Sequence, residues 1–208
     1  MALVKLNNNG VKNATAFGSI TGLGNLILIK TQTASSSASV SFVDGASSVV
    51  LDNTYKEYIF YFNNIHPATN AAKFRFVGST NTGSSYGVAT TTTMFEAMQD
   101  ENGSNETLRY EDGDDAAQST NPLNITTGIS GANDGCVSGF FHLFEPSSST
   151  FAKHFISTMQ FMNGSGTPYC VQNRTAGYIN STSAVDAIQF SFASGNIDAG
   201  TISLYGVV

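Results

Sequence analysis

The sequence predicts an all-β protein, an antiparallel β-sandwich of jelly-roll type with an extended N-terminal segment. Apolar and polar residues alternate with a period of two in short segments such as 73–77 and 188–192. This alternation is the pattern of strands that bury one face. Turn residues, chiefly Gly, Asn, Asp and Pro, separate such segments at the spacing of about 8–12 residues that is typical of sandwiches and barrels. No window has a clear helical pattern, and the only helical candidate is one turn at 94–99.

The 208 residues fit one large β domain preceded by an N-terminal extension. We expect residues 1–38 to form an extended docking segment with a polar linker, and residues 39–208 to form the sandwich. Residues 31–39 are nearly all Ser, Thr and Ala, as in a linker. Segments of this composition often fold only on a partner. The one apolar stretch of the extension is the candidate docking segment and consists of Leu26, Ile27, Leu28 and Ile29.

Strand signals follow one another from residue 39 to the end of the chain. The expected strands are 40–43, 55–62, 73–77, 91–98, 107–110, 136–144, 153–162, 169–172 and 176–179. The last residues predict a β-hairpin, because two alternating segments flank a turn rich in Gly, Asn and Asp. In this hairpin the inward side chains are Phe190, Phe192, Ile202 and Leu204, and the outward ones are Gln189, Ser191 and Ser203.

Charge is sparse, which narrows the classes of partner. Charged residues make up 12% of the chain, and its net charge is −6. No Lys or Arg lies between Arg109 and Lys153, so the chain lacks the basic stripe of a nucleic-acid binder. No apolar run approaches the roughly 20 residues that span a bilayer. The first residues are also too short for a signal peptide. We therefore expect synthesis in a cytoplasm and no nucleic-acid or membrane partner.

The two cysteines and three histidines do not form a recognisable site. Cys136 and Cys170 each lie beside strand-like sequence and are expected to be buried thiols, with a disulfide bridge as the alternative. His66 lies in a corner before a proline, whereas His142 and His154 lie on two different expected strands. If those strands pair, the imidazoles could meet, but a zinc site would need further ligands in register. Ordinary strand histidines are the favoured interpretation.

One acidic run, residues 111–115, is the only candidate for a cation site. Asp112, Asp114 and Asp115 could supply some of the oxygens that Ca²⁺ needs, but they lack the spacing of an EF-hand loop. A solvated turn is the favoured interpretation. No nucleophile-elbow pattern is present either. We therefore expect no metal, no cofactor and no enzymatic activity.

Exposed tyrosines are the one hint of a ligand. Tyr86, Tyr110 and Tyr169 lie in or near expected loops, with Asn and Asp close by. Loop aromatics of this kind can stack on sugars, so these three residues are candidate glycan contacts. The alternative is that they are core or interface tyrosines.

Several segments resemble virion structural proteins of tailed bacteriophages. Residues 55–70 are similar to a "strand, then I-x-P-A-T-D" signature of those proteins, and residues 135–146 to a "strand, then Y-N-P-S" element. The ending S-G-N-I-D-A-G-T-I-S-L-Y-G-V resembles their C-terminal ends. The resemblance covers about residues 50–208. Its motifs are packing and turn motifs, so they imply a fold and a setting rather than a reaction.

The resemblance implies a non-enzymatic structural component of a virion, synthesised in the host cytoplasm. Such proteins are head-decoration, head-fibre or tail-associated proteins. We expect a homo-oligomer, with a trimer favoured, docked on capsid or tail proteins through its N-terminal segment. An aromatic-rich sheet with few charges also favours self-association. The alternative is a carbohydrate-binding receptor-recognition module that contacts a glycan of the host surface.

Overall fold

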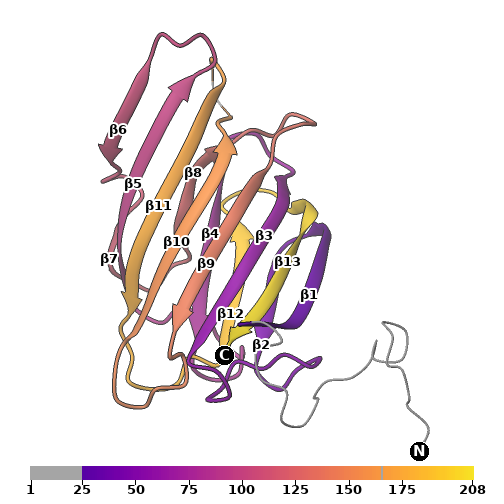
Figure 1. Ribbon diagram of the computed structural model, residues 1–208, viewed down its shortest axis with the longest axis vertical. Helices are drawn as coiled ribbons and strands as arrows, with labels where there is room; N and C mark the ends of the chain where they lie inside the picture. Colours follow the sequence, from indigo (N-terminus) through magenta and orange to yellow (C-terminus); the bar gives the residue numbers. More distant parts are fainter. Residues whose placement is uncertain (1–24, 165) are drawn as a thin grey trace, which may run out of the picture.

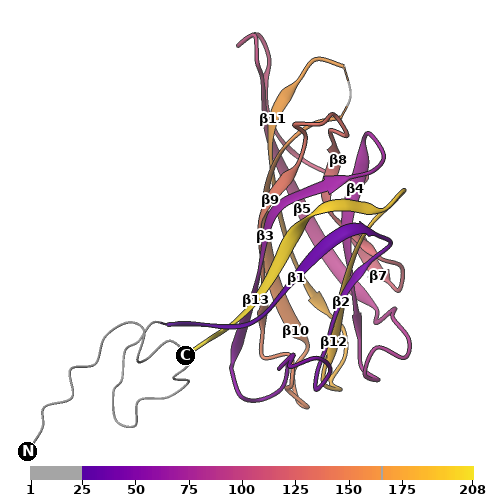
Figure 2. The same ribbon diagram turned by 90° about the vertical axis from the view of Figure 1, so that its right-hand side faces the viewer.

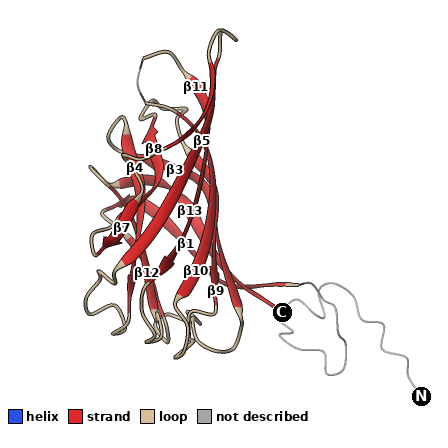
Figure 3. Ribbon diagram, turned by 90° about the vertical axis from the view of Figure 1, so that its left-hand side faces the viewer, coloured by secondary structure: helices blue, strands red, loops and turns tan. Residues whose placement is uncertain are grey.

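The computed structural model describes residues 25–164 and 166–208, and it confirms the β-sandwich. Two antiparallel sheets pack face to face, with the larger sheet in front in Figure 1 and both seen edge-on in Figure 2. The described residues contain strands, turns and loops but no helix (Figure 3). Residues 94–99, the one helical candidate, form part of a strand.

The thirteen strands divide unequally between the two sheets. The larger, nine-stranded sheet has the order β1-β13-β3-β9-β10-β11-β5-β6, with β7 also paired to β5. Its strands are β1 (Leu26–Ser37), β3 (Glu57–Pro67), β5 (Thr90–Asp100), β6 (Glu106–Tyr110), β7 (Ala116–Ser119), β9 (Val137–Phe144), β10 (Lys153–Met162), β11 (Tyr169–Ile179) and β13 (Ile197–Val207). The four-stranded sheet has the order β2-β12-β4-β8 and contains β2 (Val40–Val43), β4 (Ala72–Ser79), β8 (Leu123–Ile129) and β12 (Ala187–Phe192).

The chain passes repeatedly from one sheet to the other. Its first five strands alternate between the two sheets, and β8 and β12 each cross to the smaller sheet before the chain returns. This alternation is in keeping with the expected jelly-roll type. The nine-stranded sheet, however, is larger than either sheet of an eight-stranded jelly roll, so the two sheets here are unequal in size.

Phenylalanine rings fill the space between the sheets. The alternation on β3 places Tyr58, Phe60 and Phe62 inward, and each is at most 1% exposed. Phe190 of β12 lies at the centre of the cluster and is fully buried. Its ring contacts the rings of Phe60, Phe62, Phe74 and Phe141, at centroid distances of 4.9–6.0 Å.

The predicted closing hairpin is wrong in its pairing, although its faces are as expected. β12 pairs with β2 and β4 in the smaller sheet, whereas β13 pairs with β1 and β3 in the larger sheet. The turn residues therefore carry the chain across the sandwich instead of closing a hairpin. Phe190, Phe192, Ile202 and Leu204 still point into the core. The period of two determines which residues share a face, but not which strand lies next to them.

The expected boundary at residue 39 is also wrong. Residues 26–37 form β1, which pairs along its length with β13 at the edge of the nine-stranded sheet. The stretch expected to be a polar linker is thus the second half of an edge strand. Ser and Thr suit that position, because an edge strand presents one side to solvent. Residues 1–24 of the expected docking segment lie outside the described residues.

Replacing Phe190 with alanine should lower the free energy of unfolding by about 3–5 kcal/mol, because it leaves a cavity among four rings. Chemical denaturation of the purified variant measures this change. Gln189→Ala is the matched control, since Gln189 is half-exposed and its amide bonds only to the hydroxyl of Ser41, at 3.0 Å. A larger loss in Gln189→Ala would contradict the assigned faces.

Candidate binding surface on the nine-stranded sheet

The outer face of the nine-stranded sheet carries large apolar side chains. The smaller sheet covers only the opposite face, so the described residues leave the outer face, which faces the viewer in Figure 1, uncovered. The solvated face of an antiparallel sheet is ordinarily polar. Two regions of this outer face depart from that pattern, one at its centre and one at its β5–β6 end.

The first region, which we term the central patch, spans four neighbouring strands. Register places Tyr61 of β3 opposite Phe140 of β9, and Ile59 opposite Tyr205 of β13. The Tyr61 ring lies 5.5 Å from the Tyr205 ring and 6.4 Å from the Phe140 ring, measured between centroids. All members are half-buried in the single chain: Ile59, Tyr61, Phe140, Phe144, Ile156 and Tyr205.

Few charges interrupt the central patch. The carboxylate at the border of the patch belongs to Glu57, whose Oε2 lies 2.9 Å from Nε2 of His142. Beside Phe144 and Ile156 the face is hollowed above Ala176, and Tyr178 forms part of the rim of this hollow, whose volume is about 390 Å³. The central patch therefore presents both protruding rings and a recess.

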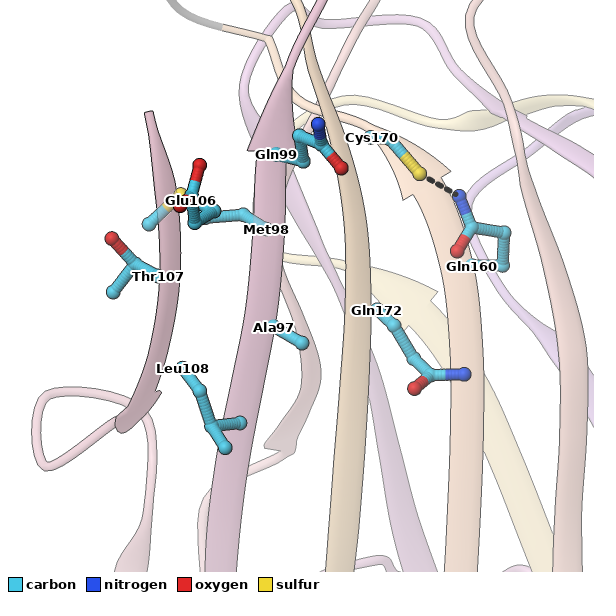
Figure 4. A pocket seen from close by; sticks show the side chains of 9 residues that line it. All are labelled: Ala97, Met98, Gln99, Glu106, Thr107, Leu108, Gln160, Cys170 and Gln172. Carbon is cyan, nitrogen blue, oxygen red and sulfur yellow. Dashed lines mark hydrogen bonds between the residues drawn. The ribbon is translucent and has the colours of Figure 1, made fainter. Parts of the chain in front are cut away.

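The second region is a groove across β6, β5, β11 and β10, shown in Figure 4, which we term the distal groove. Its volume is about 510 Å³. Three glutamines, Gln99, Gln160 and Gln172, come from three successive strands of the sheet. Ala97 leaves room between them, and Leu108 of β6, which is 78% exposed, borders the groove. Cys170 also lines it.

Two exposed rings continue the same face beyond the distal groove. Phe95 precedes Ala97 by two residues on β5, so the two side chains lie on one face. Phe95 is 50% exposed, and Tyr110, its partner on β6, is 44% exposed. The two rings pack edge to face with centroids 5.6 Å apart. The Tyr110 hydroxyl donates a hydrogen bond to the carboxylate of Asp115. We term Phe95 and Tyr110 the ring platform.

A buried polar network on the inner face fixes β6 in place. Glu96 is 3% exposed, and its carboxylate accepts hydrogen bonds from three side chains. The donors are Arg109 Nη2 at 2.9 Å, Thr127 Oγ1 at 2.6 Å and Asn173 Nδ2 at 3.1 Å. Arg109 also pairs with Glu111. Burial raises the pKa of Glu111, and the charge of Glu96 adds to this rise, whereas Arg109 opposes it.

The structure does not bring the three candidate glycan tyrosines together. Tyr110 belongs to the ring platform on the outer face, but Tyr169 lines a separate pocket beside Glu96 and Arg109, on the inner side of the sheet. Tyr86 lies in the connection between β4 and β5. Only Tyr110 has a neighbouring exposed ring among the described residues. A shared rim of all three is therefore excluded by the fold.

The candidate docking segment is the beginning of β1. Leu26, Ile27 and Leu28 are 40%, 39% and 55% exposed, respectively, whereas Ile29 packs against the core. A β-bulge interrupts the pairing with β13 between Leu28 and Lys30. The segment is thus an ordered strand with an exposed apolar start.

The acidic run is only partly the expected solvated turn. Asp112 is exposed, but Asp114 is buried, and its Oδ1 lies 2.5 Å from Lys73 Nζ and 2.7 Å from Asn124 Nδ2. Asp115 accepts the bond from Tyr110. The carboxylates of Asp114 and Asp115 therefore bind side chains of the protein. In the described part of the chain, no three His, Cys, Asp or Glu side chains lie close enough together to hold a metal ion.

The expectation that both cysteines are buried is wrong. Cys136 is half-exposed and Cys170 is exposed, and both are free thiols. The strands of His142 and His154 do pair, but His142 lies opposite Ile156, so the two histidines are offset along the ladder. His66 bonds instead through Nδ1 to the carbonyl of Gly135.

Comparisons with known proteins give no relative for this chain. No family model matches it, and neither does any curated protein or solved structure. Within residues 25–164 and 166–208 there is no membrane-spanning helix.

Glu96→Ala should destabilise the protein by about 3 kcal/mol, because it removes a buried charged acceptor from three donors. Thermal melts or denaturant titration measure the loss. Glu106→Ala, an exposed glutamate on the same strand as Arg109, should change stability by less than about 0.5 kcal/mol. Equal effects of the two substitutions would show that Glu96 does not hold β6.

Proposed function

We propose that this protein is a non-enzymatic structural component of a tailed-phage virion that assembles as a homo-oligomer, with a trimer favoured. The resemblance of residues 50–208 to virion proteins supports the setting. The central patch carries the proposal of self-association. On this proposal the protein is made in the host cytoplasm and becomes part of the capsid or the tail.

The central patch favours a contact between copies because its side chains are apolar and nearly uncharged. Interfaces between copies are enriched in aromatic residues and depleted of charge at their centre. Tyr61, Phe140 and Tyr205 supply such rings, and the recess above Ala176 offers a place for a ring of a second copy. Rings that enter pockets are the usual source of affinity in protein interfaces.

The outer face is also large enough for a stable contact. The six strands from β13 to β5, at a strand spacing of about 4.8 Å, give a width of about 29 Å. Seven residues along a strand give a length of about 23 Å, so the face covers roughly 700 Å². A standard interface buries about 800 Å² on each partner.

A second candidate function is a carbohydrate-binding module for receptor recognition on the virion surface. The exposed ring platform, which contains Tyr110, favours it. The two functions are compatible where the contact between copies is confined to the central patch, because the full six-strand face also includes β10, β11 and β5 of the distal groove.

The purified protein should be an oligomer at micromolar concentration, and light scattering coupled to size exclusion measures its mass. The double substitution Tyr61→Ser with Phe140→Ser should give a folded protein of about 22 kDa, because it removes two adjacent rings from the central patch. Phe151→Ser, which removes a ring that is 67% exposed outside the patch, should leave the oligomer intact. A monomeric wild-type chain would contradict self-association through this face.

Deletion of residues 1–24 should abolish incorporation into particles if the N-terminal segment docks the protein, and it should leave the sandwich folded. Deletion of residues 1–37 should also lower the melting temperature, since it removes β1 and leaves the edge of β13 unpaired. Incorporation is measured by the protein content of purified particles. Normal incorporation of the shorter deletion would place the docking surface elsewhere.

A further inference from the structure

We propose that the distal groove, together with the ring platform, binds a neutral saccharide. This inference deepens the second candidate function and rests on it, and it does not depend on self-association. It assigns the ligand site to the outer face of β5, β6, β10 and β11. Glycan contacts were expected from tyrosines in loops. The site proposed here consists instead of side chains on strands, and the register of the sheet brings these side chains together.

The distal groove and the ring platform together present the two kinds of group that bind a sugar ring. A pyranose has an apolar face of C–H groups and a rim of hydroxyls that both donate and accept hydrogen bonds. Phe95 and Tyr110 offer exposed rings for the apolar face. Gln99, Gln160 and Gln172 offer amides, each of which can donate and accept.

The amides are available to a ligand. Gln99, Gln160 and Gln172 are all exposed. Gln160 Nε2 makes weak bonds within the protein, at 3.3 Å to Cys170 Sγ, which is a weak acceptor, and at a long 3.4 Å to the Phe161 carbonyl. Because the three glutamines stand on successive strands, they span about 10 Å across the sheet. An extended ligand of more than one ring therefore fits the groove better than a single ring.

Charge complementarity points to an uncharged occupant. Among the described residues that line the groove, Glu106 alone carries a formal charge. Beside the ring platform, Arg174 lies opposite Phe95, and Asp115 binds the Tyr110 hydroxyl. Because the nearby charges are of both signs, neither an acidic nor a basic ligand meets a surface of single opposite charge. The volume of about 510 Å³ lies within the range of about 300–1,000 Å³ that is usual for small-molecule sites.

The site is held rigidly from behind. The pair between buried Glu96 and half-exposed Arg109 joins β6 to β5, and Asp115 accepts a hydrogen bond from the hydroxyl of Tyr110. Side chains on paired strands change position less than side chains on loops, so the groove is preorganised for binding.

A printed array of neutral and acidic oligosaccharides, probed with the full-length protein, tests the proposal. We expect retention on neutral members, and calorimetry with the strongest of these gives the affinity. Phe95→Ala should weaken binding by about tenfold, in line with the loss of one stacking ring. Gln172→Ala should also weaken it. Phe151→Ala removes an exposed ring outside the groove and should leave the affinity unchanged.

Cys170 provides an independent readout at the groove. In a Cys136→Ser background, the bound oligosaccharide should slow the labelling of Cys170 by a maleimide, and a bulky maleimide adduct should abolish retention on the array. Cys136 of the wild-type protein, followed by peptide mass spectrometry, is the control: the bound oligosaccharide should leave the rate of its labelling unchanged.

Three results would overturn the proposal: retention on no array member, retention on acidic members only, or equal affinities of Phe95→Ala and Phe151→Ala. Light scattering on the same variants separates this failure from that of the proposed function. If no saccharide binds and Phe95→Ala reduces self-association, the ring platform belongs to a contact between copies. If saccharide binds to a monomeric wild-type chain, only the proposal of self-association fails.

Discussion

The unequal size of the two sheets is the constraint on which the rest of the structure depends. Four strands cover only part of one face of a nine-stranded sheet, so apolar packing closes the sandwich where β12 and β4 lie, and other interactions must hold the remainder. At the β5–β6 end, the hydrogen-bonded pair of Glu96 and Arg109, instead of packed phenylalanine rings, joins the strands. The nine strands of the larger sheet also form a broad outer face, which the described residues leave uncovered. The candidate surfaces therefore follow from the architecture and not from a specialised loop.

The sequence predicted which face of a strand each side chain occupies better than it predicted which strands lie side by side. The inward positions of Phe190, Phe192, Ile202 and Leu204 followed from a period of two, and the structure confirms them. Their pairing could not be predicted, because a turn rich in Gly, Asn and Asp can close a hairpin or carry the chain between sheets. β1 was missed for a related reason, since its Ser and Thr residues suit a linker as well as a solvent-exposed edge. β7 and β8 were missed because their short sequences mix polar and apolar residues without clear alternation.

Most of the candidate site could not be predicted from the sequence. Tyr110 was identified, but Phe95 lay within the one helical candidate, and a helix would have turned it away from Ala97. Gln99, Gln160 and Gln172 are far apart along the chain and are ordinary surface residues taken singly. Only the pairing of β10 with β11 and of β11 with β5 places them in one groove. The alternation within each strand showed which side they occupy, but the order of strands is a long-range property.

The crossing between β12 and β13 has a consequence for biosynthesis. β12 lies between β2 and β4, and β13 lies between β1 and β3, so two strands late in the sequence are central partners of the first four. Neither sheet can be completed until β12 and β13 have left the ribosome. β3 can pair earlier with β9, and β4 with β8, but β1 and β2 have no other partner strand among the described residues and stay unpaired until β13 and β12 are made. Such long-range pairing folds slowly and exposes the chain to aggregation. A chaperone that shields β1 and β2 should therefore increase the yield of folded protein.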